Sequence, residues 1–94
     1  MNEDIENLLL LLECTLINEE NPDYIEVSFS QEHNTIYILL SKPDYINYKI
    51  HERIQGVFAL LSFEHSEIIN EIPMIIECLT PTELDDMFKT YNKE

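Results

Sequence analysis

Two short segments with the residue patterns of β-strands, separated by a short connection, constrain the fold of this chain most strongly. Residues 24–30 alternate strictly between polar and apolar positions, and residues 35–41 are rich in β-branched and aromatic side chains. Both patterns predict β-strands. The connection, residues 31–34, has the length of a hairpin loop. The chain is therefore expected to build a sheet around this hairpin. The residues of the first strand expected to face the core are Ile25, Val27 and Phe29.

Helical periodicity surrounds this hairpin. Apolar residues recur at helical spacing over residues 4–17, 47–62 and 66–72. In the second of these segments the stripe expected in the core is Ile50, Ile54, Val57, Phe58 and Leu61. Gly56 lies inside that predicted helix, where glycine costs about 1 kcal/mol relative to alanine. We therefore expect Gly56 to mark close packing against a neighbouring element.

A third strand and a capped helix complete the pattern. Residues 74–79 are predicted to form the strand, and residues 81–91 the helix. Thr80 offers a hydroxyl at the N-cap, Pro81 occupies the first helical position, and Glu83 follows three residues after the cap. The resulting order is α-β-β-α-α-β-α. Residues 1–94 are expected to form a single α+β domain, a two-layer sandwich with helices on a three-stranded sheet.

The charge of the chain restricts its partners. The formal net charge is −14, from 19 acidic and five basic residues, and residues 1–41 hold nine carboxylates and no Lys or Arg. Binding to a nucleic-acid backbone requires an array of basic side chains, so we expect no direct nucleic-acid binding. A protein partner with a basic surface is favoured instead, captured in part by Glu19, Glu20 and Asp23. The alternative is that the acidity only keeps the protein soluble.

The cysteines and the leucine run bear on the compartment. Cys14 and Cys78 form no C-x-x-C pair, and we expect both to be buried, reduced and apolar in behaviour, as in a cytoplasmic protein. The run of leucines over residues 8–12 is far too short to span a bilayer. Acidic residues precede it, unlike the basic start of a signal peptide. We therefore expect a cytoplasmic protein without a membrane association.

Motifs for catalysis or metal binding are missing from the sequence. It contains no H-E-x-x-H, C-x-x-C or G-x-S-x-G pattern, and His33, His51 and His65 are scattered. The single glycine cannot make a phosphate loop or the G-x-x-G loop of an RNA-binding KH domain. We therefore expect no enzymatic activity, no metal site and no cofactor.

Two segments are candidates for partner contact. Tyr45, Tyr48, Lys49 and Arg53 cluster after the second strand, and tyrosine and arginine are enriched at interface hot spots. The alternative is that this segment is packed over the helix by its own tyrosines. Leu10 and Leu11 lie off the apolar stripe of the first helix. They predict a second apolar face, covered by a partner or by a second copy of the chain.

The element order, the length and the segment 75–84 resemble the BolA family. In that family the third strand runs directly into a Leu-Thr-Pro-x-Glu helix start, which Leu79 to Glu83 match here. The stretches Glu52–Ile54, Val57–Phe58 and Leu60–Leu61 resemble the central helix of the family, and the resemblance covers roughly residues 24–88.

The resemblance implies a KH-like α+β fold of class II, a monothiol glutaredoxin as partner, and an iron–sulfur cluster shared with it. The chain departs from the family at the ligand positions. Ile54 stands where the central helix of the family carries a histidine, and Ile72 where a histidine begins the third strand. His33, in the hairpin loop, is the remaining counterpart. The fold is expected to carry over, and the usual cluster ligation is not.

Two functions fit these features. The first is a non-catalytic adaptor or regulator of BolA-like shape that binds a protein through surface contacts. The second is an acidic inhibitor, such as a nuclease immunity protein or a phage anti-defence protein, that presents carboxylates where phosphates would lie on a basic partner. An inhibitor should carry a continuous stripe of carboxylates, whereas an adaptor should carry an apolar or mixed patch with carboxylates around it.

Overall fold

The computed structural model describes residues 3–92 and has the predicted order of elements. These are α1 (Glu3–Glu20), β1 (Tyr24–Ser30), β2 (Thr35–Ser41), the 3-10 helix η1 (Pro43–Asn47), α2 (Ile50–Glu64), α3 (Ser66–Glu71), β3 (Met74–Leu79) and α4 (Pro81–Asn92). The mixed α+β class and the order α-β-β-α-α-β-α are thereby confirmed. The bounds of the strands are those predicted from the sequence.

Within residues 3–92 the strands form a three-stranded sheet in the order β1-β2-β3. β1 and β2 pair antiparallel, with Tyr24 opposite Ser41 and Ser30 opposite Thr35. β2 and β3 pair parallel, with Ile36 opposite Met74. A parallel pair cannot be joined by a tight turn, and here α2 and α3 make the crossover. The central strand β2 therefore has partners on both edges.

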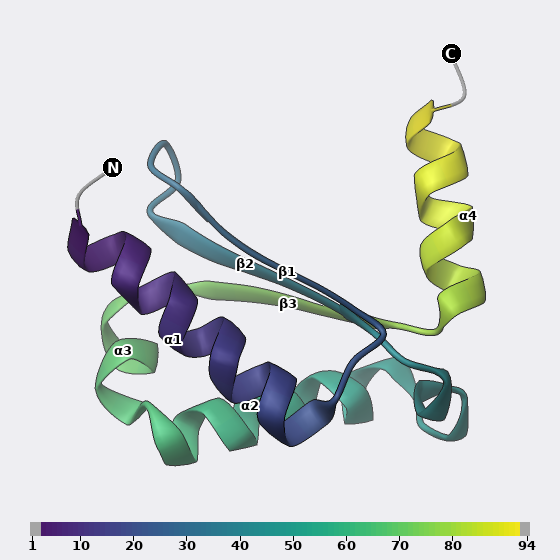
Figure 1. The fold of residues 1–94 in the computed structure, drawn as a ribbon, viewed down its shortest axis with the longest axis horizontal. Helices are drawn as coiled ribbons and strands as arrows, with labels where there is room; N and C mark the ends of the chain where they lie inside the picture. Colours follow the sequence, from purple (N-terminus) through teal and green to yellow (C-terminus); the bar gives the residue numbers. More distant parts are fainter. Residues whose placement is uncertain (1–2, 93–94) are drawn as a thin grey trace.

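The core lies between the sheet and the layer that contains α1 and α2 (Figure 1). Residues of β2 at every second position face this layer, because side chains of a strand alternate between its faces. The buried apolar cluster comprises Leu12, Leu16, Ile36, Ile38, Leu40, Tyr45, Val57, Leu61, Ile76 and Cys78. Ile25, Val27 and Phe29 pack against it as predicted. Helix α4 leaves the end of β3 and projects from the side of the sheet opposite α1 and α2 (Figure 1).

The start of α4 forms the predicted capping box. The backbone N–H of Glu83 donates to Thr80 Oγ1 at 3.2 Å, and the backbone N–H of Thr80 donates to Glu83 Oε1 at 2.8 Å. Each bond satisfies an amide that has no partner inside the helix. The box therefore sets the place where the chain turns from β3 into α4.

Two helix boundaries differ from the prediction. Residues 47–62 were expected to form one helix, but the chain forms η1 first and begins α2 at Ile50. Tyr48 is extended between them, with φ −129° and ψ 148°, and Glu52 Oε1 accepts from the N–H of Lys49 at 2.8 Å to begin α2. Helix α1 is longer than the predicted 4–17 and ends before Asn21, whose φ of 48° is a common helix-ending conformation for asparagine.

Some predicted core positions are wrong. Ile50 and Phe58 are exposed on α2, while Arg53 is buried on the same helix. Among the described residues, nothing beyond the helix itself lies within 4 Å of the point where a Cβ on Gly56 would stand, so this glycine does not mark close packing. Cys14 is exposed on α1, and only the expectation for Cys78 is met. Periodicity places a residue on a stripe of the helix, but the neighbouring elements decide whether that stripe is covered.

Candidate functional site

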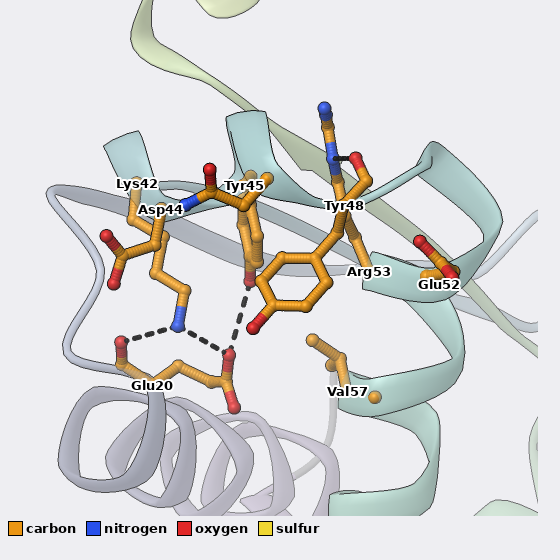
Figure 2. A pocket seen from close by; sticks show the side chains of 10 residues that line it. Glu20, Lys42, Asp44, Tyr45, Tyr48, Glu52, Arg53 and Val57 are labelled. Atoms are coloured by element: carbon orange, nitrogen blue, oxygen red, sulfur yellow. Dashed lines mark hydrogen bonds and ion pairs between the residues drawn. The ribbon is translucent and has the colours of Figure 1, made fainter.

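A pocket of about 450 Å³ lies where the end of α1, helix η1 and the beginning of α2 meet (Figure 2). It brings together one residue before the hairpin and a group of residues that follow β2. Its lining consists of Glu20, Lys42, Asp44, Tyr45, Asn47, Tyr48, Glu52, Arg53, Gly56 and Val57. This set includes Glu20, Tyr45, Tyr48 and Arg53, which the sequence marked as contact residues.

The local fold of this segment follows from Pro43 and from short-range hydrogen bonds. Pro43 stands at the beginning of η1, where its fixed φ suits a helix and its missing N–H ends the ladder of β2. The N–H of Tyr45 then donates to the carbonyl of Lys42 at 3.2 Å, and the N–H of Tyr48 donates to that of Tyr45 at 3.1 Å. These turns direct Tyr45 inward, where it is buried, and leave Tyr48 outside.

Lys42 joins this segment to α1. Its Nζ donates to Glu20 Oε1 at 3.0 Å and to the backbone carbonyl of Glu20 at 3.2 Å. The carbonyls at the end of a helix carry a partial negative charge, so the ammonium stabilises the end of α1 as well as the carboxylate. Tyr45 Oη lies 3.4 Å from the same Glu20 oxygen, and Lys42 Nζ lies 5.1 Å from the centre of the Tyr45 ring. Figure 2 shows this group at the side of the pocket formed by α1.

Arg53 lines the pocket on the side away from Glu20 (Figure 2). Its Nε donates to the carbonyl of Tyr48 at 3.0 Å, and its Nη1 donates to the carbonyl of Cys78 at 3.1 Å. Nη1 also lies 2.7 Å from Glu83 Oε1 in α4. The guanidinium therefore connects the segment before α2 to the end of β3 and to the start of α4. A buried guanidinium has to be paired in this way, because leaving its charge unpaired would be costly.

The buried polar groups near the pocket are held in their neutral forms. Burial raises the pKa of the Tyr45 hydroxyl well above its usual range, with Cys78 and Glu20 adding to the effect. Burial also raises the pKa of the Cys78 thiol to about 11. A thiol is a good nucleophile only as the thiolate, so Cys78 is unreactive at neutral pH. Tyr45 and Cys78 thus have the properties of structural groups.

The outer surface beside the pocket is apolar. From Ile46 in η1 to Ile50, the first residue of α2, the exposed fractions are 71% for Ile46, 55% for Tyr48 and 54% for Ile50. We call residues 46–50 the apolar segment; Lys49 within it is exposed as well. Sequence reasoning missed Ile46 and Ile50, because it placed Ile50 on the core stripe of a longer helix. The proline and the turn residues before them were the available signal that the helix begins later.

The predicted contact residues fall into two groups. Tyr48, Lys49, Glu19, Asp23, Leu10 and Leu11 are exposed. Tyr45 and Arg53 are buried where they line the pocket, and Glu20 is half-buried in its ion pair with Lys42. Tyr45 is thus packed inward, as the alternative interpretation expects, whereas Tyr48 is exposed. Leu10 and Leu11 lie on α1 outside the pocket lining.

The histidines lie apart from the pocket. His33 is exposed in the turn between β1 and β2, and His65 Nε2 lies 2.9 Å from Thr15 Oγ1, which connects the end of α2 to α1. Over the described part of the chain, no group of three or more His, Cys, Asp or Glu side chains is placed to hold a metal ion. In the same residues, no helix has the combination of length and apolar character that crossing a bilayer requires.

No protein-family model and no curated protein sequence matches this chain. Among solved structures, BolA1 from Arabidopsis thaliana is similar, with a TM-score of 0.62 and 15% sequence identity. The match covers 80% of this chain and 93% of that chain. The chain therefore has a BolA-like fold, as its segment from Leu79 to Glu83 suggested. At this identity the likeness concerns the fold alone.

The iron–sulfur cluster that the BolA resemblance implies does not fit the residues present. Ile54 and Ile72, at the positions where the family carries histidines, are half-buried and offer no donor atom. His33 is exposed in its turn. We therefore derive no role for such a cluster in this protein.

Proposed function

We propose that this protein is a non-catalytic adaptor or regulator that binds a protein partner through the apolar segment, residues 46–50, and the pocket beside it. The observation that carries the proposal is the exposure of Ile46, Tyr48 and Ile50 on a segment whose base is fixed by Arg53. Exposed apolar side chains on a rigid support lose little conformational entropy on binding, which is how interface hot spots gain their energy.

The chemistry of the pocket supports binding over catalysis. Lys42 is paired with Glu20, Arg53 is paired with Glu83, and the Tyr45 hydroxyl stays protonated. These groups stabilise the surface rather than meet a substrate. The BolA-like fold is consistent with the same proposal.

The arrangement of charge favours an adaptor over an acidic mimic of nucleic acid. A mimic requires a continuous stripe of carboxylates, whereas the apolar segment is a mixed surface that contains Lys49. Glu19 and Asp23, exposed at the end of α1 and before β1, then serve to attract a partner with a basic surface.

A photo-crosslinking experiment tests the proposal. A photoreactive phenylalanine replaces Tyr48 in the native cell, with a matched control at Glu67, which is exposed on α3 and lines neither pocket. We expect a defined adduct from position 48 that is missing from position 67. The captured protein is then purified and its binding to the double variant Ile46→Ser, Tyr48→Ser is measured. The dissociation constant of this complex should rise at least about tenfold, as expected for hot-spot residues. Equal adducts from the two positions, or unchanged affinity of the double variant, would contradict the proposal.

A further inference from the structure

A second groove lies on the face of the sheet that α1 and α2 leave uncovered. Its volume is about 350 Å³, and it is lined by residues of β1, β2, β3 and α4. Figure 1 shows α4 standing away from the sheet on this side, so that the helix covers one end of the face and leaves the rest open. The lining of this groove shares no residue with the apolar segment or with the pocket beside it.

The register of the sheet sets the charge pattern of the groove floor. Leu39 of β2 pairs with Glu26 on β1 and with Glu77 on β3, so these three side chains form one row across the open face. Adjacent strands are about 4.8 Å apart, which places the backbones of Glu26 and Glu77 roughly 10 Å from each other with Leu39 between them. Glu26 and Glu77 are exposed.

The neighbouring row is apolar on two of its strands. Tyr37 of β2 pairs with Ile75 on β3 and with Ser28 on β1. Ile75 has an exposed fraction of 47%, although it lies within a strand of the sheet. Leu39, Tyr37 and Ile75 form an apolar strip. Glu26 on β1 and Glu77 on β3 are the carboxylates on its two sides. An exposed apolar strip on a sheet commonly marks a surface that another element covers.

Helix α4 forms the wall of the groove with Met87 and Phe88. The ring of Phe88 meets that of Tyr24 edge to face, with centroids 5.8 Å apart and an interplanar angle of 77°. The start of the helix is held by the capping box and by Arg53. The start of α4 and the ring of Phe88 are therefore both fixed by contacts within the chain. The wall is thus formed before any partner binds.

Charge complementarity selects the occupant. Among the described residues that line the groove, none is basic, and the whole chain carries a formal charge of −14. A second copy would bring its own Glu26 and Glu77 against those of the first, and a nucleic acid would bring phosphates. An α-helix with its side chains is about 10–12 Å in diameter. This is close to the distance between the two outer strands, which carry Glu26 and Glu77.

We propose that this groove binds an amphipathic helix of a partner protein that carries an apolar stripe with Lys or Arg on both flanks. The stripe packs on Leu39, Tyr37 and Ile75, and the flanking cations pair with Glu26 and Glu77. Long basic side chains cover apolar surface with their stems while their charged ends reach a carboxylate. The surface is separate from the apolar segment, so the protein has a second binding face and can connect two partners.

The test uses a peptide of stated composition. It is about 16 residues long, which allows an isolated Ala-rich helix, with Leu at i, i+3, i+4 and i+7, one row of Lys on each flank of this stripe, and Ala elsewhere. Glu26→Gln with Glu77→Gln should weaken binding about tenfold, and Glu64→Gln with Glu67→Gln, both exposed outside the groove, should change it less than about twofold. The second pair removes the same charge from outside the groove. Ile75→Thr, which keeps a strand-forming residue, should also weaken binding.

Amide chemical shifts in the isotope-labelled protein locate the peptide. The expected changes lie on β1, β2 and β3 and around Met87 and Phe88 of α4. Equal weakening by the two charge-neutralised pairs, shift changes confined to the apolar segment, or no binding of the peptide would overturn the proposal. A self-association that light scattering detects and that Ile75→Thr abolishes would identify a second copy as the occupant, and this too would overturn it. None of these outcomes affects the crosslinking result expected at Tyr48.

Discussion

The Nη1 atom of Arg53 lies 2.7 Å from Glu83 Oε1, and this ion pair connects α2 to the start of α4. The same Nη1 donates to the carbonyl of Cys78, while Nε donates to the carbonyl of Tyr48. Glu83 also accepts from the backbone N–H of Thr80. One buried cation thus fixes both the segment that carries the proposed contact surface and the helix that forms the wall of the second groove.

Replacing Arg53 with methionine should destabilise the protein. The variant keeps much of the apolar volume but leaves the carbonyls of Tyr48 and Cys78 without their charged donor, and hydrogen bonds to charged groups contribute about 1.5–3 kcal/mol each. We expect the free energy of unfolding, measured by urea titration, to fall by about 3 kcal/mol. The matched control is Lys49→Met, an exposed cation four residues earlier. A loss for Arg53→Met no larger than for this control would contradict the role assigned to Arg53.

The Glu83 carboxylate should make stability depend on pH. The backbone N–H of Thr80 and then the guanidinium of Arg53 lower its pKa from the usual 4.5. A carboxyl whose folded pKa lies below its unfolded value contributes stability that is complete above the unfolded pKa. That contribution is lost as the pH falls through the folded pKa. The difference in unfolding free energy between wild type and Glu83→Gln should therefore be constant above about pH 5.5 and shrink below pH 4.5.

Urea titrations over a series of pH values measure this difference. Repeating them in the Arg53→Met background isolates the share due to the ion pair, because the cation is then missing from both proteins. We expect a smaller decrease with acid in that background. A difference between wild type and Glu83→Gln that does not change between pH 6 and pH 3 would show that Glu83 acts only as a hydrogen-bond acceptor.

The N-cap of α4 can be tested with two neighbouring threonines. Thr80 Oγ1 accepts from the N–H of Glu83, whereas Thr82 is exposed on the first turn. Loss of a capping hydroxyl typically costs about 1 kcal/mol. Thr80→Ala should therefore lower the free energy of unfolding by about this amount, and Thr82→Ala should change it by less than about 0.5 kcal/mol. Equal effects of the two substitutions, measured by thermal unfolding, would argue against the cap.

The cysteines should differ in reactivity. Cys14 is exposed on α1, while Cys78 is buried and has a pKa raised to about 11. Thiol reagents attack the thiolate, so at pH 8 the native protein should be alkylated rapidly at Cys14 and remain unmodified at Cys78. Mass spectrometry of the intact protein counts the adducts, and unfolding in guanidinium should expose the second thiol. Rapid native labelling of Cys14→Ser would contradict the buried position of Cys78.

The sequence predicts the sheet better than the site. The bounds of β1 follow from its alternation, and those of β2 from its run of β-forming residues, which Pro43 brings to an end. The burial of Arg53 could not be predicted, because its partners Cys78 and Glu83 come from β3 and α4. The exposure of Ile50 has the same origin. A helical stripe is buried only where another element covers it, and that depends on the packing of the whole chain.

The candidate surfaces show the same limit. The cluster of tyrosine and basic residues pointed to Tyr48 and Lys49, which are exposed. It could not separate them from Tyr45, which turns inward at η1. The groove on the open face of the sheet was not predicted. Its signal, Glu26 and Glu77 at polar positions opposite Leu39, becomes readable only when the register of all three strands in the described chain is known.

The leucines of α1 offer a direct comparison of buried and exposed positions. Leu12 is fully buried in the core, whereas Leu10 and Leu11 are exposed on another face of the same helix. Leu12→Ala should lower the free energy of unfolding by about 2–5 kcal/mol, the usual range for a buried leucine. Leu10→Ser with Leu11→Ser should change it by about 1 kcal/mol at most, because each site already faces water.

The expectation that a partner or a second copy covers these leucines then has a clear measurement. Light scattering over a range of protein concentrations should show self-association that the double serine variant loses, or a captured partner should bind that variant more weakly. If the wild type is monomeric at every concentration and the partner binds both proteins equally, the exposed leucines are not an interface.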